Sequence, residues 1–196
     1  MSENKKKSPT FVEVEGDAIE LFFKSETSAI IMHGANCQKQ MGAGIAAQIR
    51  HNIPPLFYLD QYDSRLATQR FGSFSAVVLA DTQDQLKIGA NLYTQYNPGA
   101  NFDIDALKTS IKALTFTIPP EQRHTFTVYV PQIGCGIGGG SWKDVLPVLK
   151  DVLSEFNVVA VTYKASPPPK PQAIEPATVV VEDIPEAPKK RTRRSK

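Results

Sequence analysis

Hydrophobic and polar positions follow two different periods between residues 10 and 163, and each period predicts one kind of element. Short runs rich in β-branched residues, bounded by turn-forming residues, predict strands. The first predicted strand, near residues 11–14, alternates apolar with acidic positions and is expected at the edge of a sheet. The predicted strands are Phe11–Val14, Ala29–His33, Phe74–Leu79, Ala90–Tyr93, Phe126–Pro131 and Val158–Tyr163.

Longer segments with apolar residues three and four positions apart predict helices between these strands. Alternation of strands and helices predicts an α/β fold with a mostly parallel sheet and helices on both faces. In such sheets, ligands bind beyond the carboxyl ends of the strands, in the loops that lead into helices. The predicted helices are Ala43–Arg50, Leu56–Leu66, Asp103–Phe116 and Trp142–Phe156.

Charge divides the chain into three parts. The whole chain carries a net charge of +2, but residues 1–9 carry +2 and residues 166–196 carry +3, which leaves −3 for residues 10–165. We therefore predict a flexible N-terminus over 1–9, one folded domain over 10–165 and a disordered, proline-rich basic tail over 166–196. A solvated end that aids solubility is the preferred interpretation of the tail, and a weak nucleic-acid contact is the alternative.

Membrane and secreted classes do not fit this composition. No run approaches the ~18 apolar residues that cross a bilayer, and no apolar stretch follows the charged N-terminus. The two cysteines, Cys37 and Cys135, are too few for a disulfide framework. We expect a cytoplasmic monomer with reduced thiols.

The first candidate site is a loop that follows the strand ending at His33. The loop holds Asn36 and Gln40 and enters the next helix through residues 42–44, two of which are glycines. Glycines let the backbone approach a ligand, and the unpaired N–H groups at a helix N-terminus suit an anion. A tight turn at a crowded helix entry is the alternative interpretation.

The second candidate site is the loop over residues 131–142. It has five glycines in seven residues, more than a turn needs, and lies between an apolar strand and an amphipathic helix. Successive amides in such a loop form a concave nest for phosphate oxygens. Ser141 is also placed to be the N-cap of the helix that follows.

This loop contains the pattern GxGxxG, which also occurs in dinucleotide-binding dehydrogenases. That fingerprint normally opens the fold, with an acidic residue after the next strand. Here only one predicted strand remains, and it ends in Thr162, Tyr163 and Lys164. No Gly-Lys-Ser/Thr follows either, so the P-loop pattern is also absent.

Taken together, four segments resemble the macro domain family over residues 12 to about 163. They are Gly16-Asp17 after the first strand, residues 29–36 (AIIMHGAN), residues 42–46 (GAGIA) and residues 131–138 (PQIGCGIG). The resemblance implies a three-layer α/β/α macro domain with a mixed, mostly parallel central sheet. It also implies ADP-ribose or a derivative as the small-molecule ligand, with no cofactor and no metal.

The resemblance assigns a part of the ligand to each segment. Asp17 would accept a hydrogen bond from the adenine amino group, Asn36 would face the distal ribose, and the two glycine loops would enclose the diphosphate. Tyr163 would pack on the adenine, with a plain surface tyrosine as the alternative. The implied binding residues are Asp17, Ala18, Gly42, Ala43, Gly44, Ile45, Gly134, Cys135, Gly136, Ile137, Gly138 and Tyr163.

Within the family, residues 33–37 (HGANC) and 133–142 are similar to the ADP-ribose-1″-phosphate phosphatase branch. This implies His33 as general acid or base and Asn36 as the residue that positions the ribose. A structural histidine at a strand end is the alternative for His33. Cys135 lacks the Cys-x5-Arg pattern of cysteine phosphatases.

Two other functions stay open. One is an ADP-ribosyl hydrolase that removes ADP-ribose from protein or nucleic acid, and the other is a reader that binds without chemistry. The family's lysine- and aspartate-dependent deacylation is not supported, because Gly138, Gln95 and Tyr96 occupy the matching positions.

Overall fold

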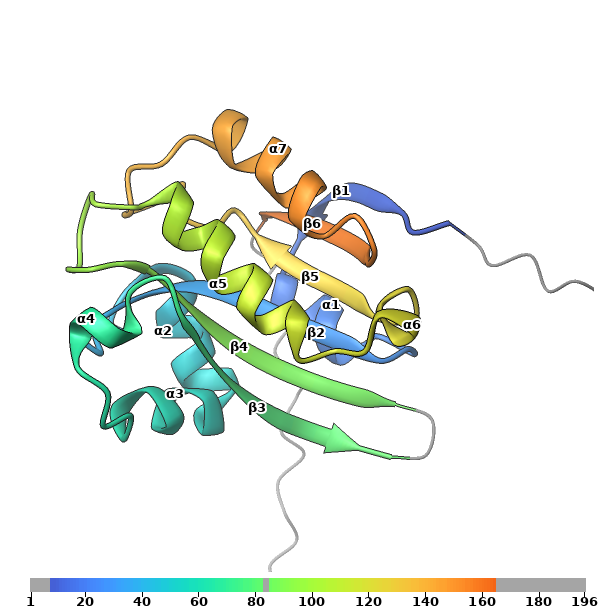
Figure 1. Cartoon of the computed structure of the whole chain (residues 1–196), viewed down its shortest axis with the longest axis horizontal. Coiled ribbons are helices and arrows are strands. Elements are labelled where there is room, and N and C mark those ends of the chain that lie inside the picture. Colours follow the sequence, from blue (N-terminus) through green and yellow to red (C-terminus); the bar gives the residue numbers. More distant parts are fainter. Residues whose placement is uncertain (1–7, 83–84, 165–196) are drawn as a thin grey trace, which may run out of the picture. The chain divides into compact units, whose positions relative to one another are not determined.

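The computed structural model describes residues 8–82 and 85–164, and its centre is one six-stranded sheet (Figure 1). The strand order across the sheet is β1-β6-β5-β2-β4-β3. The strands are β1 (Phe11–Gly16), β2 (Ala29–Asn36), β3 (Phe74–Asp81), β4 (Leu86–Gln95), β5 (Thr127–Pro131) and β6 (Asn157–Tyr163). The predicted proline-rich tail lies outside the described residues, and so does the predicted N-terminal segment except for residues 8 and 9.

The sheet is mixed and mostly parallel, as predicted. All neighbouring strands run parallel except β3, which pairs antiparallel with β4. β1 is an edge strand, paired with β6 only. The carboxyl ends of the five parallel strands therefore meet at one edge of the sheet, where the two glycine-rich loops leave it.

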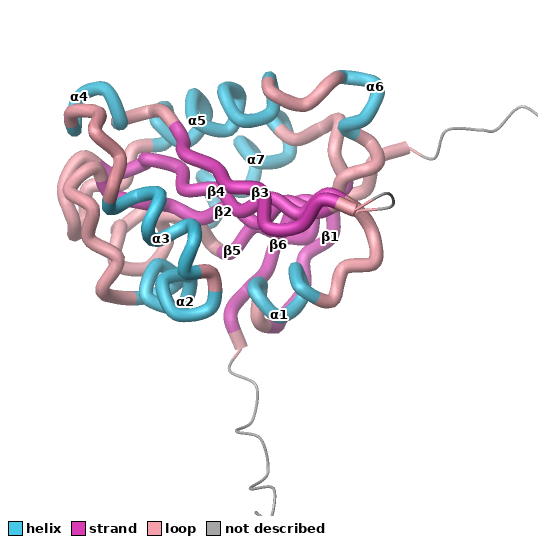
Figure 2. Tube along the Cα trace, turned by 90° about the horizontal axis from the view of Figure 1, so that it is seen from below, coloured by secondary structure: helices cyan, strands magenta, loops and turns pink. Residues whose placement is uncertain are grey.

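Helices cover both faces of the sheet, which gives three layers (Figure 2). One face carries α5 and α7, and the other carries α1, α2 and α3. The helices are α1 (Ala18–Phe23), α2 (Gly44–Asn52), α3 (Pro54–Gln61), α4 (Ala67–Arg70), α5 (Ile104–Phe116), α6 (Pro120–Arg123) and α7 (Trp142–Val152).

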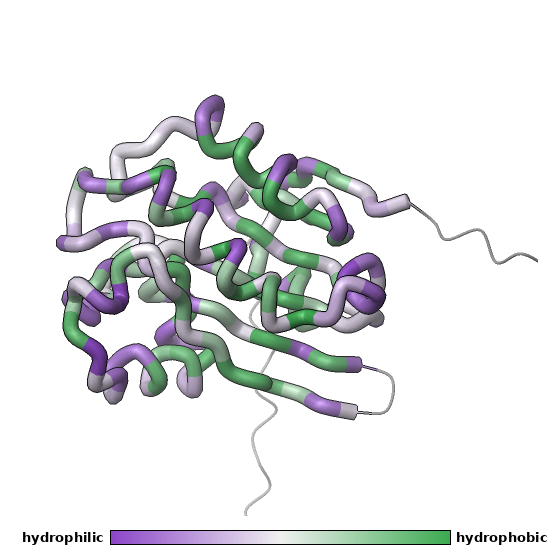
Figure 3. The backbone as a smooth tube through the Cα atoms, viewed as in Figure 1, coloured by the Kyte–Doolittle hydropathy of each residue, from purple (hydrophilic) through white to green (hydrophobic). Residues whose placement is uncertain are grey.

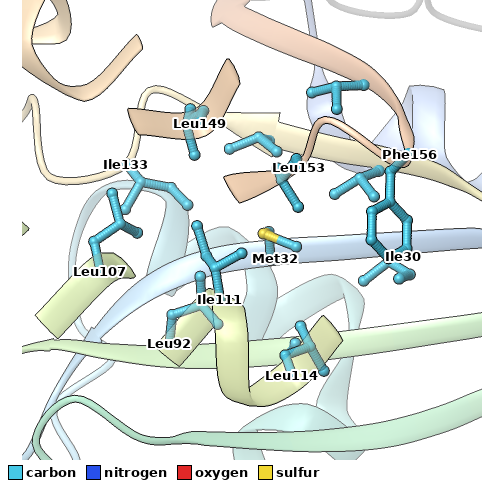
Figure 4. Packing of buried hydrophobic residues seen from close by; sticks show 14 of the residues in the cluster. Ile30, Met32, Leu92, Leu107, Ile111, Leu114, Ile133, Leu149, Leu153 and Phe156 are labelled. Atoms are coloured by element: carbon cyan, nitrogen blue, oxygen red, sulfur yellow. The ribbon is translucent and has the colours of Figure 1, made fainter. Parts of the chain in front are cut away.

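The strand period of two divides the core between these faces. In β2, Ile30 and Met32 pack with α5 and α7, whereas Ala29 and Ile31 pack with the other helices. Apolar colour follows the strands in Figure 3, and Figure 4 shows Met32 among the side chains of the first cluster. Because both faces are covered, β2 is buried along nearly all of its length.

Several predicted elements differ from the structure. The predicted helix over 56–66 ends at Gln61, because the Asp63 carboxylate accepts the Arg65 amide at 3.0 Å and forms a local turn instead. The predicted helix over 142–156 ends at Val152. The short helix α1 was missed, since its six residues are too few to show a period.

Ser141 occupies the N-cap position of α7, but its side chain makes no capping hydrogen bond. The position was therefore predicted correctly and the contact was not. No helix in the described ranges has both the length and the apolar character needed to cross a bilayer.

Candidate ligand cavity

A cavity of about 530 Å³ opens at the edge where the parallel strands end. Its walls come from the ends of β1, β2, β4, β5 and β6 and from the loops that follow β2 and β5. All predicted site residues except Asp17 and His33 line it. The lining is formed by Gly16, Ala18, Gly34, Ala35, Asn36, Gln40, Gly42, Ala43, Gly44, Ile45, Ala46, Gln48, Gln95, Pro98, Gly99, Pro131, Gln132, Ile133, Gly134, Cys135, Gly136, Ile137, Gly138, Val161 and Tyr163.

The first glycine loop, residues 34–43, is folded around the side chain of Asn36. The Asn36 Oδ1 accepts the amides of Gln38 at 3.0 Å and Gln40 at 3.2 Å, and its Nδ2 donates to the Gln40 carbonyl at 2.7 Å. Lys39 between them has a positive φ of 59°. Asn36 thus determines the shape of this loop in the ligand-free structure.

The first glycine loop delivers the chain into the N-terminus of α2. Ala43 is the N-cap and makes no side-chain capping bond. The first N–H groups of an α-helix have no partner within the helix, and here Gly44, Ile45 and Ala46 lie on the cavity wall. This wall therefore presents N–H donors and the positive end of a helix dipole to a ligand.

The second glycine loop, residues 132–140, forms the opposite wall. Two of its carbonyls are bonded within the loop, since Gly134 O accepts the Gly140 amide at 2.8 Å and Gly136 O accepts the Gly139 amide at 3.1 Å. Within the described part of the chain, the amides of Gly136, Ile137 and Gly138 donate to no protein acceptor. Three successive free amides beside a cavity form an anion nest.

A buried polar network, formed mainly by the α3–α4 segment, contacts the first glycine loop and stabilises it. Arg70 and Asp60 form an ion pair with both side chains 1% exposed, and Arg70 Nη1 donates to the Cys37 carbonyl at 3.0 Å. Burial raises the pKa of Asp60, against the effects of Arg70 and of the Tyr93 hydroxyl, which donates to it at 3.1 Å. Lys39 Nζ adds a second tie, donating to the carbonyl of Asp63 at 2.6 Å.

His33 belongs to this network and not to the cavity. It is fully buried, and it faces the α2 and α3 layer because it shares the strand parity of Ala29 and Ile31. Its Nε2 lies 2.6 Å from Asn91 Oδ1 and its Nδ1 lies 3.0 Å from Gly34 O. Burial lowers the pKa of His33 to about 4, although both contacts oppose the shift. The expectation that His33 is an acid or base in contact with substrate does not fit this position, so the structural alternative holds.

Asp17 also has a structural contact that the sequence did not reveal. It is the N-cap of α1, and its Oδ1 accepts the amides of Ile19 at 2.8 Å and Glu20 at 3.1 Å. Its neighbours Gly16 and Ala18 line the cavity, but Asp17 itself does not.

The cavity wall is almost free of ionisable side chains. Among the lining residues, which all lie in the described ranges, the titratable side chains are Cys135 and Tyr163. Burial raises the pKa of Cys135, whose Sγ donates to the Ile133 carbonyl at 3.3 Å, so this thiol is not set up as a thiolate nucleophile. The lining can therefore bind charge only through neutral donors.

Four glutamines line the cavity, and two of them, Gln48 and Gln95, lie outside the loops that the sequence predicted as candidate sites. Gln40, Gln48, Gln95 and Gln132 come from four different segments, which only the folded chain brings to one cavity. Gln95 Nε2 donates to the Gly99 carbonyl at 2.6 Å and so fixes the loop after β4. No local pattern distinguishes such residues from surface glutamines.

Comparison with known proteins defines the class of this fold. No family model matches the chain. The macrodomain of Mycobacterium tuberculosis DarG superposes with a TM-score of 0.60 at 24% identity, covering 81% of this chain and 99% of that one. Thermosipho africanus DarTG in complex with ADP-ribose also gives a TM-score of 0.60, at 21% identity over 81% of this chain and 43% of that one. These likenesses establish a macrodomain fold.

Two relatives are similar in sequence. An uncharacterised 17.5 kDa protein from the tk-vs intergenic region of Enterobacteria phage T4 is 30% identical over 152 residues, which is 77% of this chain and 95% of that protein. An ADP-ribose 1″-phosphate phosphatase of Scheffersomyces stipitis is 29% identical over 172 residues, covering 76% and 98%. The chain thus has the macrodomain fold, and it resembles the ADP-ribose-1″-phosphate phosphatase branch of the macro domain family.

Proposed function

We propose that this protein binds ADP-ribose and its derivatives and hydrolyses ADP-ribose 1″-phosphate to ADP-ribose and phosphate. The observation that carries the proposal is the pair of amide-lined walls, one at the α2 N-terminus and one over residues 136–138, that face the same cavity. A diphosphate has oxygens on two sides and needs donors on both. The likeness to a phosphatase of that name and to an ADP-ribose complex supports the choice of ligand.

The proposal also gives the ligand a direction in the cavity. We place the adenine at the end formed by Ala18, Val161 and Tyr163. Asp17 precedes Ala18 in the chain, and its second carboxylate oxygen, which makes no capping bond, is the proposed acceptor for the adenine amino group. The diphosphate lies between the two amide walls. The distal ribose lies beside Asn36 and Gln40, at the end of β2.

In the proposed reaction, a water oxygen attacks the 1″-phosphorus, the P–O1″ bond breaks, and its electron pair goes to O1″. Amides of the glycine loops beside the distal ribose stabilise the charge that develops on the phosphoryl oxygens. Asn36 holds the ribose and keeps the first glycine loop in shape. Because the wall offers no carboxylate or imidazole, the water proton passes to a non-bridging oxygen of the substrate phosphate and then to O1″.

The neutral wall also favours a second candidate. A phosphate monoester adds two negative charges that would rest on neutral donors alone, whereas ADP-ribose linked to protein or nucleic acid carries no extra charge at C1″. Removal of ADP-ribose from a macromolecule, or recognition without chemistry, is that second candidate. Turnover separates recognition from the two reactions, and the released product separates the two reactions from each other.

The test is calorimetric titration with ADP-ribose, followed by phosphate release from ADP-ribose 1″-phosphate in the same preparation. We expect binding and phosphate release in the wild type, and loss of both in Asn36→Ala. Asn52→Ala is the matched control, because Asn52 lies at the far end of α2, where its side chain donates to the Gln48 carbonyl. Absence of ADP-ribose binding would refute the proposal, and binding without phosphate release would leave the second candidate.

A further inference from the structure

The ring of Phe102 fills a notch that exists only because residues 134 and 140 are glycines. A Cβ on Gly134 would lie 2.2 Å from the Phe102 Cδ2 atom, and a Cβ on Gly140 would lie 2.6 Å from its Cδ1 atom. Both distances are far below van der Waals contact. The ring is therefore packed directly on the backbone of the second glycine loop at both of its ends.

The segment that carries Phe102 also bonds the middle of this loop. The Phe102 amide donates to Gly138 O at 3.1 Å, and a Cβ on Gly139 would lie 3.0 Å from the Cβ of Ala100. The loop closes on itself through the Gly140 amide and Gly134 O. These contacts engage the carbonyls of Gly134 and Gly138 within the protein.

The amides that remain free are those of the cavity wall. Residues 136–138 have unpaired N–H groups, as described above, and they lie between the two points that the ring holds. A loop with five glycines has large backbone freedom, so free amides alone would not stay in one arrangement. An external contact has to supply that order.

We propose that Phe102 is a positioning residue for ligand binding, whose ring holds the second glycine loop with its free amides directed into the cavity. The inference rests on the proposed ligand and adds a residue that does not line the cavity. It also links the two glycine loops, because Gln95 pairs with Phe102 in an isolated β-bridge and its carbonyl accepts the Cys37 amide of the first loop at 2.8 Å. A ring that merely filled the core would affect stability but would have no specific effect on ligand affinity.

A double-mutant cycle between the ring and the glycine tests this contact. Phe102→Ala removes the ring, and Gly140→Ala adds the Cβ that would strike it, at a residue whose φ is not in the left-handed region. We expect each single variant to weaken ADP-ribose binding by roughly tenfold or more, because the amides move off their positions. In the Phe102→Ala background, Gly140→Ala should cost clearly less than it does in the wild type, since the clash with the ring is gone and only the 3.1 Å approach to Gly134 O remains.

Phe74→Ala is the matched control. Phe74 is another half-buried phenylalanine that packs on the same hydrophobic cluster, but it lies on β3 and is not among the atoms in the notch. We expect Phe74→Ala to lower the melting temperature while leaving ADP-ribose affinity within about twofold of the wild type. Equal affinity losses in Phe74→Ala and Phe102→Ala would overturn the positioning role.

Amide hydrogen exchange separates this inference from the proposed function. In the ligand-free protein, Phe102→Ala should increase exchange over residues 134–140 while exchange in α5 changes less. If wild-type protein fails to bind ADP-ribose, the proposed function falls, and this exchange result still decides whether the ring holds the loop. Wild-type affinity and unchanged exchange in Phe102→Ala would overturn the inference alone.

Discussion

The two glycine loops face each other across one cavity, but different kinds of contact hold them. The first loop rests on a buried ion pair, a lysine bonded to carbonyls, and Met41, which is packed in the core. The second loop rests on one aromatic ring and on its own backbone hydrogen bonds. Charged and polar side-chain contacts order the first loop, and close packing orders the second. Substitutions should therefore destabilise the two loops by different mechanisms.

The difference follows from what each loop must do. The first glycine loop carries side chains, including Asn36 and Gln40, whose amide groups need fixed orientations. Directional polar contacts from the α3–α4 segment supply this order. The second glycine loop presents only backbone N–H groups, and close packing against residues without a Cβ is enough to fix them.

The largest expected effect is the loss of the buried charge pair. Arg70→Met leaves Asp60 buried without its partner, which costs about 3–5 kcal/mol in the free energy of unfolding. Arg123→Met, at the partly exposed pair with Glu155, should cost about 1 kcal/mol or less. Urea unfolding of both variants measures the difference, and equal losses would show that the first loop is not held by charge.

The second effect is acid sensitivity on the same side of the sheet. The pKa of His33 falls from the ordinary 6.5 to about 4 on folding. Between these two pH values, His33 is therefore protonated in the unfolded chain and neutral in the folded chain. Stability is complete above pH 6.5 and is lost as the pH falls toward 4, by on the order of 3 kcal/mol.

Unfolding at several pH values between 4 and 7 checks this sign. His33→Gln should flatten the dependence in that window, whereas His51→Gln, at an exposed position of α2, should leave it unchanged. Stability that rises as the pH falls from 6.5 would contradict the assignment of a buried neutral imidazole.

A third, smaller effect contrasts one glycine from each loop. Gly134 has a φ of 76° and no room for a Cβ, so Gly134→Ala should cost about 2 kcal/mol and disturb the second loop. Gly42 has nothing within 4 Å of its added Cβ and no left-handed φ, so Gly42→Ala should change stability by less than about 1 kcal/mol. Thermal unfolding of the two variants compares the same substitution in the two loops. Similar losses of stability would show that the second loop does not depend on close packing around Gly134.

Much of this arrangement could be predicted from the sequence because it is local. Strand periods and glycine-rich strand-to-helix loops are short patterns, and they placed Asn36 and residues 134–138 on the cavity. The prediction for His33 did not apply the alternation of side chains along the strand to the residue after Met32. Parity alone would have turned its side chain toward the helices on the other face.

What supports the loops is not local, and no period reveals it. Phe102 contacts Gly134 and Gly140, which are more than thirty positions later in the sequence. Arg70 donates to the carbonyl of Cys37, which is more than thirty positions earlier. These pairs depend on strand order, which puts β2 between β5 and β4. A glycine whose missing side chain makes room for a distant ring looks, in sequence, like any glycine in a turn.

The smallest expected effect concerns the ligand itself, and both walls contribute to it. If neutral amides alone hold the diphosphate, ADP-ribose affinity should change by less than about twofold between pH 6 and pH 8, where the ligand's charge is constant. The half-buried Cys135 thiol stays protonated over this range, because partial burial raises its pKa. Gln132→Glu serves as the internal control, since a carboxylate added to the wall should weaken binding and make it weaker still as ionic strength falls. A step in ADP-ribose affinity near pH 6.5 in the wild type would instead indicate that an ionising group contacts the ligand. Such a result would argue for His33 as a ligand contact, against its buried position outside the cavity.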